Sequence, residues 1–148
     1  MMKRSTAREI AMHFSYELAY SGLSAGELLE RRFSDEYFPE LSGEDEIYSE
    51  KPDEKALEYI KRVVEGVDTH GAELDEYIAK YSKGWNFSRI SRTAAAIMRV
   101  CMFEVLYMDD VPDSAAVNEA VEIAKKYEEK ETVSFVNGIL GSFIRGEK

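Results

Sequence analysis

The sequence predicts an all-α protein, and three observations support this prediction. Apolar residues recur at intervals of three and four in about seven segments, the spacing that places them along one side of a helix. No segment alternates polar and apolar residues over the length of a strand. The 148 residues are 45% hydrophobic, which is enough for one compact domain or for two small helical bundles that share an interface.

Three helices are predicted in the first half of the chain, over residues 4–20, 24–38 and 53–68. Ser24 is the expected N-cap of the second helix, and Pro39 marks its end because proline lacks a backbone N–H. Residues 40–52 are acidic and are expected to form a solvated loop. Gly71 is expected to break the third helix.

Four helices are predicted in the second half, over residues 72–81, 91–107, 114–128 and 132–145. Residues 91–107 are apolar on most of the circumference, so this helix is expected to be central and buried. Trp85, in the connection before it, is expected to reach the core. Cys101 is expected to be a small core residue rather than a nucleophile.

The composition argues against several classes of function. One cysteine allows no internal disulfide and no cysteine-rich zinc site, and no apolar run is long enough to span a bilayer, so a cytoplasmic protein is expected. His13 and His70 lie in different helices without acidic residues at metal-ligand spacing. No glycine-rich phosphate loop or nucleophile motif is present. The sequence therefore predicts no enzyme, no metal and no cofactor.

The net charge of −10 argues at first against a nucleic-acid partner, since phosphate contacts require lysine and arginine. The acidic residues are unevenly distributed, however. Residues 35–58 carry ten acidic and two basic side chains, whereas residues 1–34 carry four acidic and five basic ones. A polyanionic partner is thus compatible with the rest of the chain.

A small basic and aromatic cluster is predicted on the first helix. At about 100° per residue, Tyr16 points away from the apolar stripe and is expected to be exposed. Arg4 and Arg8 lie one turn apart on the flank that runs toward the same outer face, with Lys3 just upstream. Cations bind phosphate and an aromatic face stacks on a base, so the cluster favours single-stranded RNA. An ordinary solvated helix face is the alternative.

Two strings near the C-terminus carry a resemblance to a known family. Residues 116–127 read A-V-N-E-A-V-E-I-A-K-K-Y after the Val-Pro pair at 111–112, and residues 134–140 read S-F-V-N-G-I-L. They resemble the NusB family of transcription antitermination factors. Further agreement comes from A-R-E at 7–9, V-E-G-V at 64–67, Trp85, Arg89, I-M-R at 97–99 and F-E-V-L-Y at 103–107. The likeness spans nearly the whole chain and is weakest at residues 35–52.

The resemblance implies a single all-α domain, residues 1–148, of two small helical-bundle subdomains at approximately 1–70 and 71–148. It implies a non-catalytic RNA-binding adaptor without a cofactor. Members of the family bind the boxA element of nascent ribosomal RNA leaders together with the ribosomal protein NusE. This antitermination complex lets RNA polymerase read through terminators.

The family's RNA-binding positions carry over onto specific residues of this chain. The arginine-rich N-terminal motif, the tyrosine of the first helix, and the aromatic and amide of F-V-N-G fall on Lys3, Arg4, Arg8, Tyr16, Phe135 and Asn137. Phe135 is predicted on the flank of its helix. A structural role in capping or close packing is instead favoured for Asn118, Glu119, Gly138 and Gly141.

Departures from the family pattern leave an alternative open. Ser5 and Thr6 stand where relatives often have arginine, which predicts weak RNA binding without a partner protein. Ala94 and Ala95 replace residues that are often charged, so the NusE surface is not carried over. The alternative is a protein-interaction or self-associating module of the same fold with little RNA affinity. A homodimer that buries the first helix would mask the RNA site.

Overall fold

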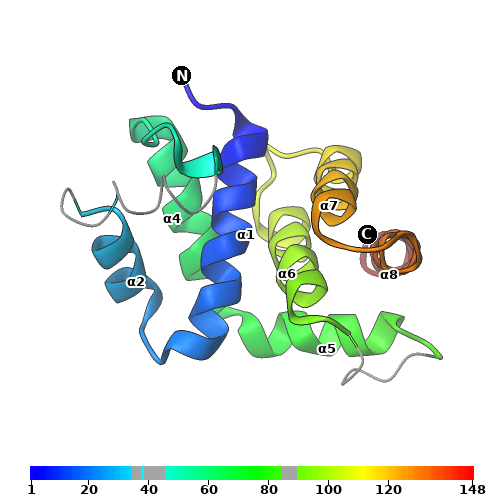
Figure 1. The fold of residues 1–148 in the computed structure, drawn as a ribbon. Coiled ribbons are helices and arrows are strands. Elements are labelled where there is room, and N and C mark those ends of the chain that lie inside the picture. Colours follow the sequence, from blue (N-terminus) through cyan, green and yellow to red (C-terminus); the bar gives the residue numbers. More distant parts are fainter. Residues whose placement is uncertain (35–37, 39–45, 85–89) are drawn as a thin grey trace. The chain divides into compact units, whose positions relative to one another are not determined.

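The computed structural model describes residues 1–34, 38, 46–84 and 90–148, and in these ranges the protein is all-helical, without strands (Figure 1). The predicted fold class is therefore confirmed. The elements are α1 (Arg4–Ser21), α2 (Ala25–Arg32), the 3₁₀ helix η1 (Glu46–Tyr48), α4 (Glu54–Thr69), α5 (Gly71–Tyr81), α6 (Arg92–Tyr107), α7 (Asp113–Tyr127) and α8 (Lys130–Glu147). No helix in the described ranges is long and apolar enough to cross a membrane.

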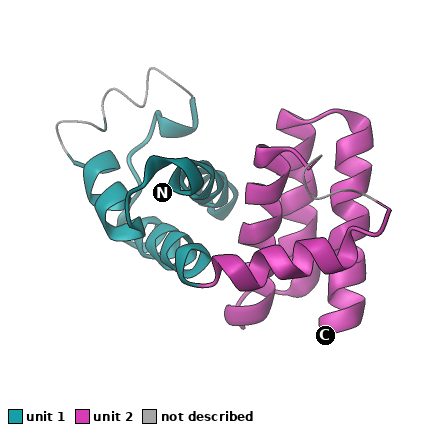
Figure 2. Cartoon of the chain, turned by 90° about the horizontal axis from the view of Figure 1, so that it is seen from below, with its two compact units in different colours: residues 1–69 teal, residues 70–148 magenta. Residues whose placement is uncertain are grey.

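The chain divides into two compact units, Met1–Thr69 and His70–Lys148, which Figure 2 shows in separate colours. In the first unit α1 packs along α4, and α2 contacts both of these helices. In the second unit α6 contacts α5, α7 and α8. Each unit therefore buries the apolar stripes of its own helices.

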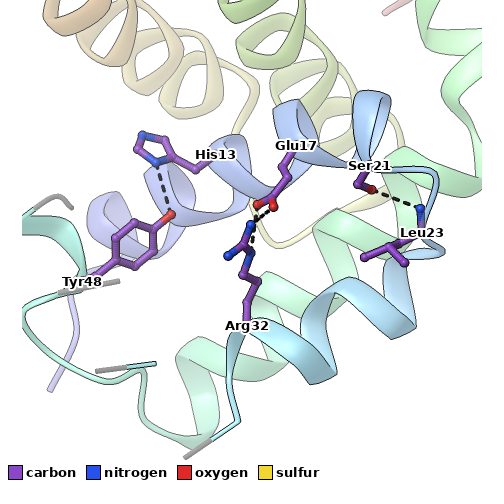
Figure 3. Close-up of polar contacts among 6 residues, drawn as sticks. All are labelled: His13, Glu17, Ser21, Leu23, Arg32 and Tyr48. Carbon is purple, nitrogen blue, oxygen red and sulfur yellow. Dashed lines mark hydrogen bonds and ion pairs between the residues drawn. The ribbon is translucent and has the colours of Figure 1, made fainter. Parts of the chain in front are cut away.

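The second helix begins where the sequence predicts and ends earlier. Ser24 and Glu27 form a reciprocal capping box, and each side chain accepts the other's backbone N–H at 3.2 Å. Helix α2 stops at Arg32 rather than at residue 38. The Arg32 guanidinium pairs with Glu17 of α1 (Figure 3). Phe33 packs against Phe14 with ring centroids 5.2 Å apart, so aromatic packing overrides the helical pattern here.

The predicted solvated loop is wrong in its second half. Ile47, Tyr48 and Pro52 are buried, and the Tyr48 hydroxyl lies 3.2 Å from Nδ1 of His13 (Figure 3). The Tyr48 ring stacks near Phe14 at 6.2 Å. The segment from Glu46 to Pro52 thus contributes to the core, whereas residues 39–45 lie outside the described part of the chain.

Asp53 ties the N-terminus to the start of α4. Its carboxylate accepts the backbone N–H of Ala56 at 2.9 Å and that of Met2 at 3.3 Å. The N–H of Ala56 is the main reason that the pKa of Asp53 lies below its usual value, and the N–H of Met2 adds to it. The residues just before α1 are therefore held beside α4.

The break after α4 lies at His70 and not at Gly71, which is the first residue of α5. The His70 ring stacks on Tyr107 of α6 with centroids 4.2 Å apart. The Tyr107 hydroxyl donates to Glu73 of α5 at 2.6 Å. The chain thus turns at His70, a residue type that does not by itself predict a helix end. Contacts between residues distant in the sequence accompany this turn.

Helix α6 is the buried centre of its unit, as its composition predicts. Ser91 caps it by accepting the N–H of Ala94 at 3.0 Å and also donates to Glu128 at 2.6 Å. Cys101 is buried, in agreement with the predicted core role. Glu104 is fully buried too, which the pattern did not predict. Trp85 and Arg89 lie outside the described residues.

Candidate nucleic-acid interface

The N-terminal end of α1 presents exposed positive charge. Lys3 occupies the N-cap position and Arg4 the first turn, and both side chains are exposed. The Arg4 guanidinium lies over the ring of Tyr59 of α4, 4.3 Å from its centroid. A hollow of about 190 Å³ beside it is lined by Met1, Met2, Arg4, Ala7, Asp53, Lys55 and Ala56. The Tyr59 ring thus orients the Arg4 guanidinium, and Lys55 in the lining of the hollow supplies a second cation.

Arg8 differs from the prediction, because only 4% of it is exposed. Met12 and Ser15 follow it at i+4 and i+7 and are also buried, so α1 carries a buried edge that the apolar spacing did not predict. The Arg8 guanidinium lies 5.8 Å from the Tyr59 centroid. Its stem is therefore part of the packing, and it does not extend the exposed basic cluster.

Tyr16 is exposed, as its place on the helix predicts, with 37% of its surface accessible. Tyr20, one turn later, is 53% exposed, and the two ring centroids lie 5.6 Å apart. The i, i+4 spacing of the two tyrosines is present in the sequence and marks the pair. The outer face of α1 therefore carries two adjacent aromatic rings.

Phe135 of α8 lies on the flank of its helix and is half-buried, which agrees with its predicted position. It lines a hollow of about 590 Å³, here called the Phe135 hollow. The other lining residues are Tyr81, Ser82, Lys83, Gly138, Ile139, Ser142, Arg145 and Gly146. Gly138 was expected to allow close helix packing, but a Cβ there would meet no described atom within 4 Å, so this residue borders open space instead.

Asn137 lies on a different face of α8 from Phe135, since two residues along a helix differ by about 200°. It is exposed and lines a second hollow of about 790 Å³ between α7 and α8, together with Asn118, Lys125 and Lys130. Lys125 is paired with Glu122 at 3.0 Å in the same hollow. The structure thus separates the aromatic and the amide of the F-V-N-G string.

The predicted site residues fall into three groups. Lys3, Arg4 and Tyr16 lie on exposed parts of the first unit, Phe135 and Asn137 line separate hollows of the second, and Arg8 is buried. Sequence reasoning missed Tyr59, Tyr81, Lys83 and Arg145. Tyr59 meets Arg4 of α1 and Tyr81 meets Glu147 of α8, so spacing along one helix does not reveal these two tyrosines.

The N-terminal end of α1 and the Phe135 hollow each combine cations with aromatic rings, which suits phosphate and base contacts. Among the described residues, no group of three or more His, Cys, Asp or Glu side chains is placed to hold a metal ion.

Comparison with known proteins identifies the family. A model of the NusB family matches residues 5–145 of this chain. The chain belongs to the NusB family. It is 35% identical over 147 residues to the transcription antitermination protein NusB of Symbiobacterium thermophilum, covering 99% of this chain and 92% of that protein.

Solved NusB structures share the fold. NusB of T. maritima superposes with a TM-score of 0.73 at 27% identity, over 97% of this chain and 92% of that one. A structure of the antitermination factors NusB and NusE in complex with dsRNA superposes with a TM-score of 0.75 at 24% identity, over 99% of each chain. The NusB family match contains Arg8, Tyr16, Phe135 and Asn137 but begins after Arg4. Lys3 and Arg4 therefore lie outside the matched residues, and only their local geometry makes them candidates for RNA binding.

Proposed function

We propose that this protein is a non-catalytic transcription antitermination factor. It binds boxA-type single-stranded RNA of nascent ribosomal RNA leaders together with the ribosomal protein NusE, and so promotes read-through by RNA polymerase. The NusB family match over residues 5–145 carries the proposal. A protein of this function acts in the cytoplasm, where nascent transcripts are made.

In this proposal, the exposed groups of residues contact different parts of the RNA. Lys3 and Arg4 contact phosphates, because both are exposed and Arg4 is held in place by the ring of Tyr59. Phe135 stacks on an unpaired base in the Phe135 hollow, with Lys83 and Arg145 near its phosphates. Tyr16 adds an aromatic face, and Asn137 adds an amide that hydrogen-bonds to a base edge or a sugar. Arg8 supports the cluster from below by packing near Tyr59.

A second candidate function is supported by two observations. The burial of Arg8 removes one cation from the exposed cluster, and the net charge of −10 opposes a polyanion. Both favour a protein-interaction or self-associating module of the same fold with little RNA affinity.

The anisotropy of a fluorescently labelled boxA-type RNA distinguishes the two candidates. The RNA is titrated with the protein alone and then in the presence of NusE, at moderate salt. The first candidate predicts tighter binding with NusE, and weaker binding by the Arg4→Ala variant. Lys61→Ala is the matched control, because Lys61 is exposed but lies two residues past Tyr59, on the far side of α4.

The outcome separates the candidates cleanly. Absence of RNA binding with and without NusE, while NusE is still captured in a pull-down, identifies the interaction module. Equal losses in Arg4→Ala and Lys61→Ala would mean that binding depends on overall charge and not on the N-terminal end of α1.

A further inference from the structure

The last turn of α8 is joined to the last turn of α5 through one carboxylate, that of Glu147. It accepts a hydrogen bond from Nζ of Lys80 at 2.8 Å and another from the hydroxyl of Tyr81. The side chain of Glu147 is only 17% exposed, so most of its surface is occupied by these contacts.

Tyr81 belongs to the lining of the Phe135 hollow, and its ring rests directly on the backbone of α8. A Cβ added at Gly146 would collide with the Tyr81 hydroxyl oxygen and would lie 2.7 Å from Cζ of the ring. Only a glycine at this position leaves room for the ring. Glu147 therefore holds the hydroxyl of Tyr81 while Gly146 gives space to its ring.

The charge of Glu147 is otherwise unfavourable beside an RNA site. The Phe135 hollow includes two cations, Lys83 and Arg145, and a carboxylate at its edge repels phosphate. The hydrogen bond from Lys80, followed by that from Tyr81, holds the pKa of Glu147 below its usual range, so the group stays ionised at neutral pH. A pure charge effect and a positioning role thus predict opposite results when the carboxylate is removed.

We propose that Glu147 is a positioning residue for RNA binding: with Gly146, it fixes the Tyr81 ring in the wall of the Phe135 hollow, where an unpaired base stacks. The inference rests on the proposed function, because it assigns the hollow to a base. It assigns no contact between Glu147 and RNA.

The direction in which RNA affinity changes when Glu147 is substituted tests the positioning role. Glu147→Ala is expected to weaken binding about 3- to 10-fold, a part of the usual loss of one base–aromatic stack, even though it removes a negative charge. Glu147→Gln removes the same charge but keeps an oxygen that accepts from Tyr81, so it is expected to bind as the native protein does or slightly more tightly. Gly146→Ala is expected to weaken binding, because its methyl group displaces the ring.

Glu76→Ala is the matched control for charge. Glu76 is an exposed glutamate of α5, the helix that carries Tyr81, and its removal is expected to leave RNA affinity unchanged or slightly raised. Urea unfolding of each variant separates lost affinity from lost fold. Glu147→Ala binding as tightly as Glu76→Ala would overturn the inference.

A second measurement needs no RNA. In the native protein, the ring protons of Tyr81 should give nuclear Overhauser contacts to the α-protons of Gly146, given how closely the ring approaches this residue. These contacts are expected to vanish in Glu147→Ala and to persist in Glu147→Gln. Their persistence in Glu147→Ala contradicts the inference. If the native protein binds no RNA, the proposed function fails, and the NMR contacts still decide whether Glu147 positions Tyr81.

Discussion

The N-terminal end of α1 and the Phe135 hollow both place cations near aromatic rings, but they use the rings differently. Tyr59 is buried, and the Arg4 guanidinium covers its ring, so this ring orients a cation. Phe135 and Tyr81 instead line an open hollow beside Lys83 and Arg145. The comparison teaches that a basic and aromatic cluster has two distinct uses. In the proposed function, the ring covered by the protein's own cation orients a group that binds phosphate, whereas the rings that border open space stack on a base.

The largest expected effect is a difference in stability between variants of the two arginines at the start of α1, Arg8 and Arg4. Arg8→Ala is expected to lower the free energy of unfolding by about 2 kcal/mol, because it removes a buried side chain that packs near Tyr59. Arg4→Ala is expected to change it by less than about 0.5 kcal/mol, since Arg4 is exposed. Urea unfolding followed by circular dichroism measures both. Equal stability of the two variants would contradict the burial of Arg8.

Removing the ring of Phe135 tests whether a base stacks in the Phe135 hollow. Phe135→Ala is expected to weaken RNA binding about 10-fold, which corresponds to the loss of one stacked base, without changing the salt dependence. Phe135→Leu keeps apolar bulk but has no aromatic face, and it is expected to lose nearly as much. Full affinity in Phe135→Leu would indicate that the hollow buries an apolar group instead. Anisotropy titrations over a series of salt concentrations give both quantities.

Substitutions at the N-terminal end of α1 should, in contrast, change the salt dependence of RNA binding. Lys3→Ala and Arg4→Ala are each expected to reduce the slope of log K against log salt by about 0.7, the value for one phosphate contact on a single strand. The affinity at moderate salt should fall a few-fold in both. A loss of affinity that is the same at every salt concentration would argue against a phosphate contact.

A smaller effect is expected for Asn137, which lies on a different face of α8 from Phe135. Asn137→Ala is expected to weaken RNA binding about twofold, because it removes one hydrogen-bonding group without altering a ring. Asn137 and Phe135 line separate hollows, so the effects of Asn137→Ala and Phe135→Ala on the binding free energy should add. A double variant that is no weaker than Phe135→Ala alone would show that the two side chains act as one unit.

The smallest expected effect concerns pH. Folding lowers the pKa of Glu147, chiefly through the hydrogen bond from Lys80, so its carboxylate stabilises the folded protein above the ordinary pKa of a glutamate. This contribution is lost as the pH falls through the lowered pKa. The Tm of the native protein should therefore exceed that of Glu147→Gln near neutral pH and converge with it at acidic pH. A constant difference between the two Tm values would contradict this linkage.

The sequence by itself determined where most of the helices lie and how two of them begin. Apolar spacing predicted the helical segments because period and amphipathicity are properties of neighbouring residues. Ser24 and Ser91 mark helix starts through hydrogen bonds to backbone groups three residues away. Family strings near the C-terminus predicted the family that the comparison then identified. The exposure of Tyr16 also followed from helical geometry alone.

Only the tertiary structure decided which side chains remain accessible and what holds them. Arg8 and Arg4 are the same residue type one turn apart, yet packing buries one and leaves the other exposed over Tyr59. Helix α2 ends early where Phe33 meets Phe14 of another helix. The contact of Tyr81 with Glu147 joins residues 66 positions apart. Burial and long-range hydrogen bonds depend on which faces meet after folding, and the local pattern of one helix does not encode the face of its partner.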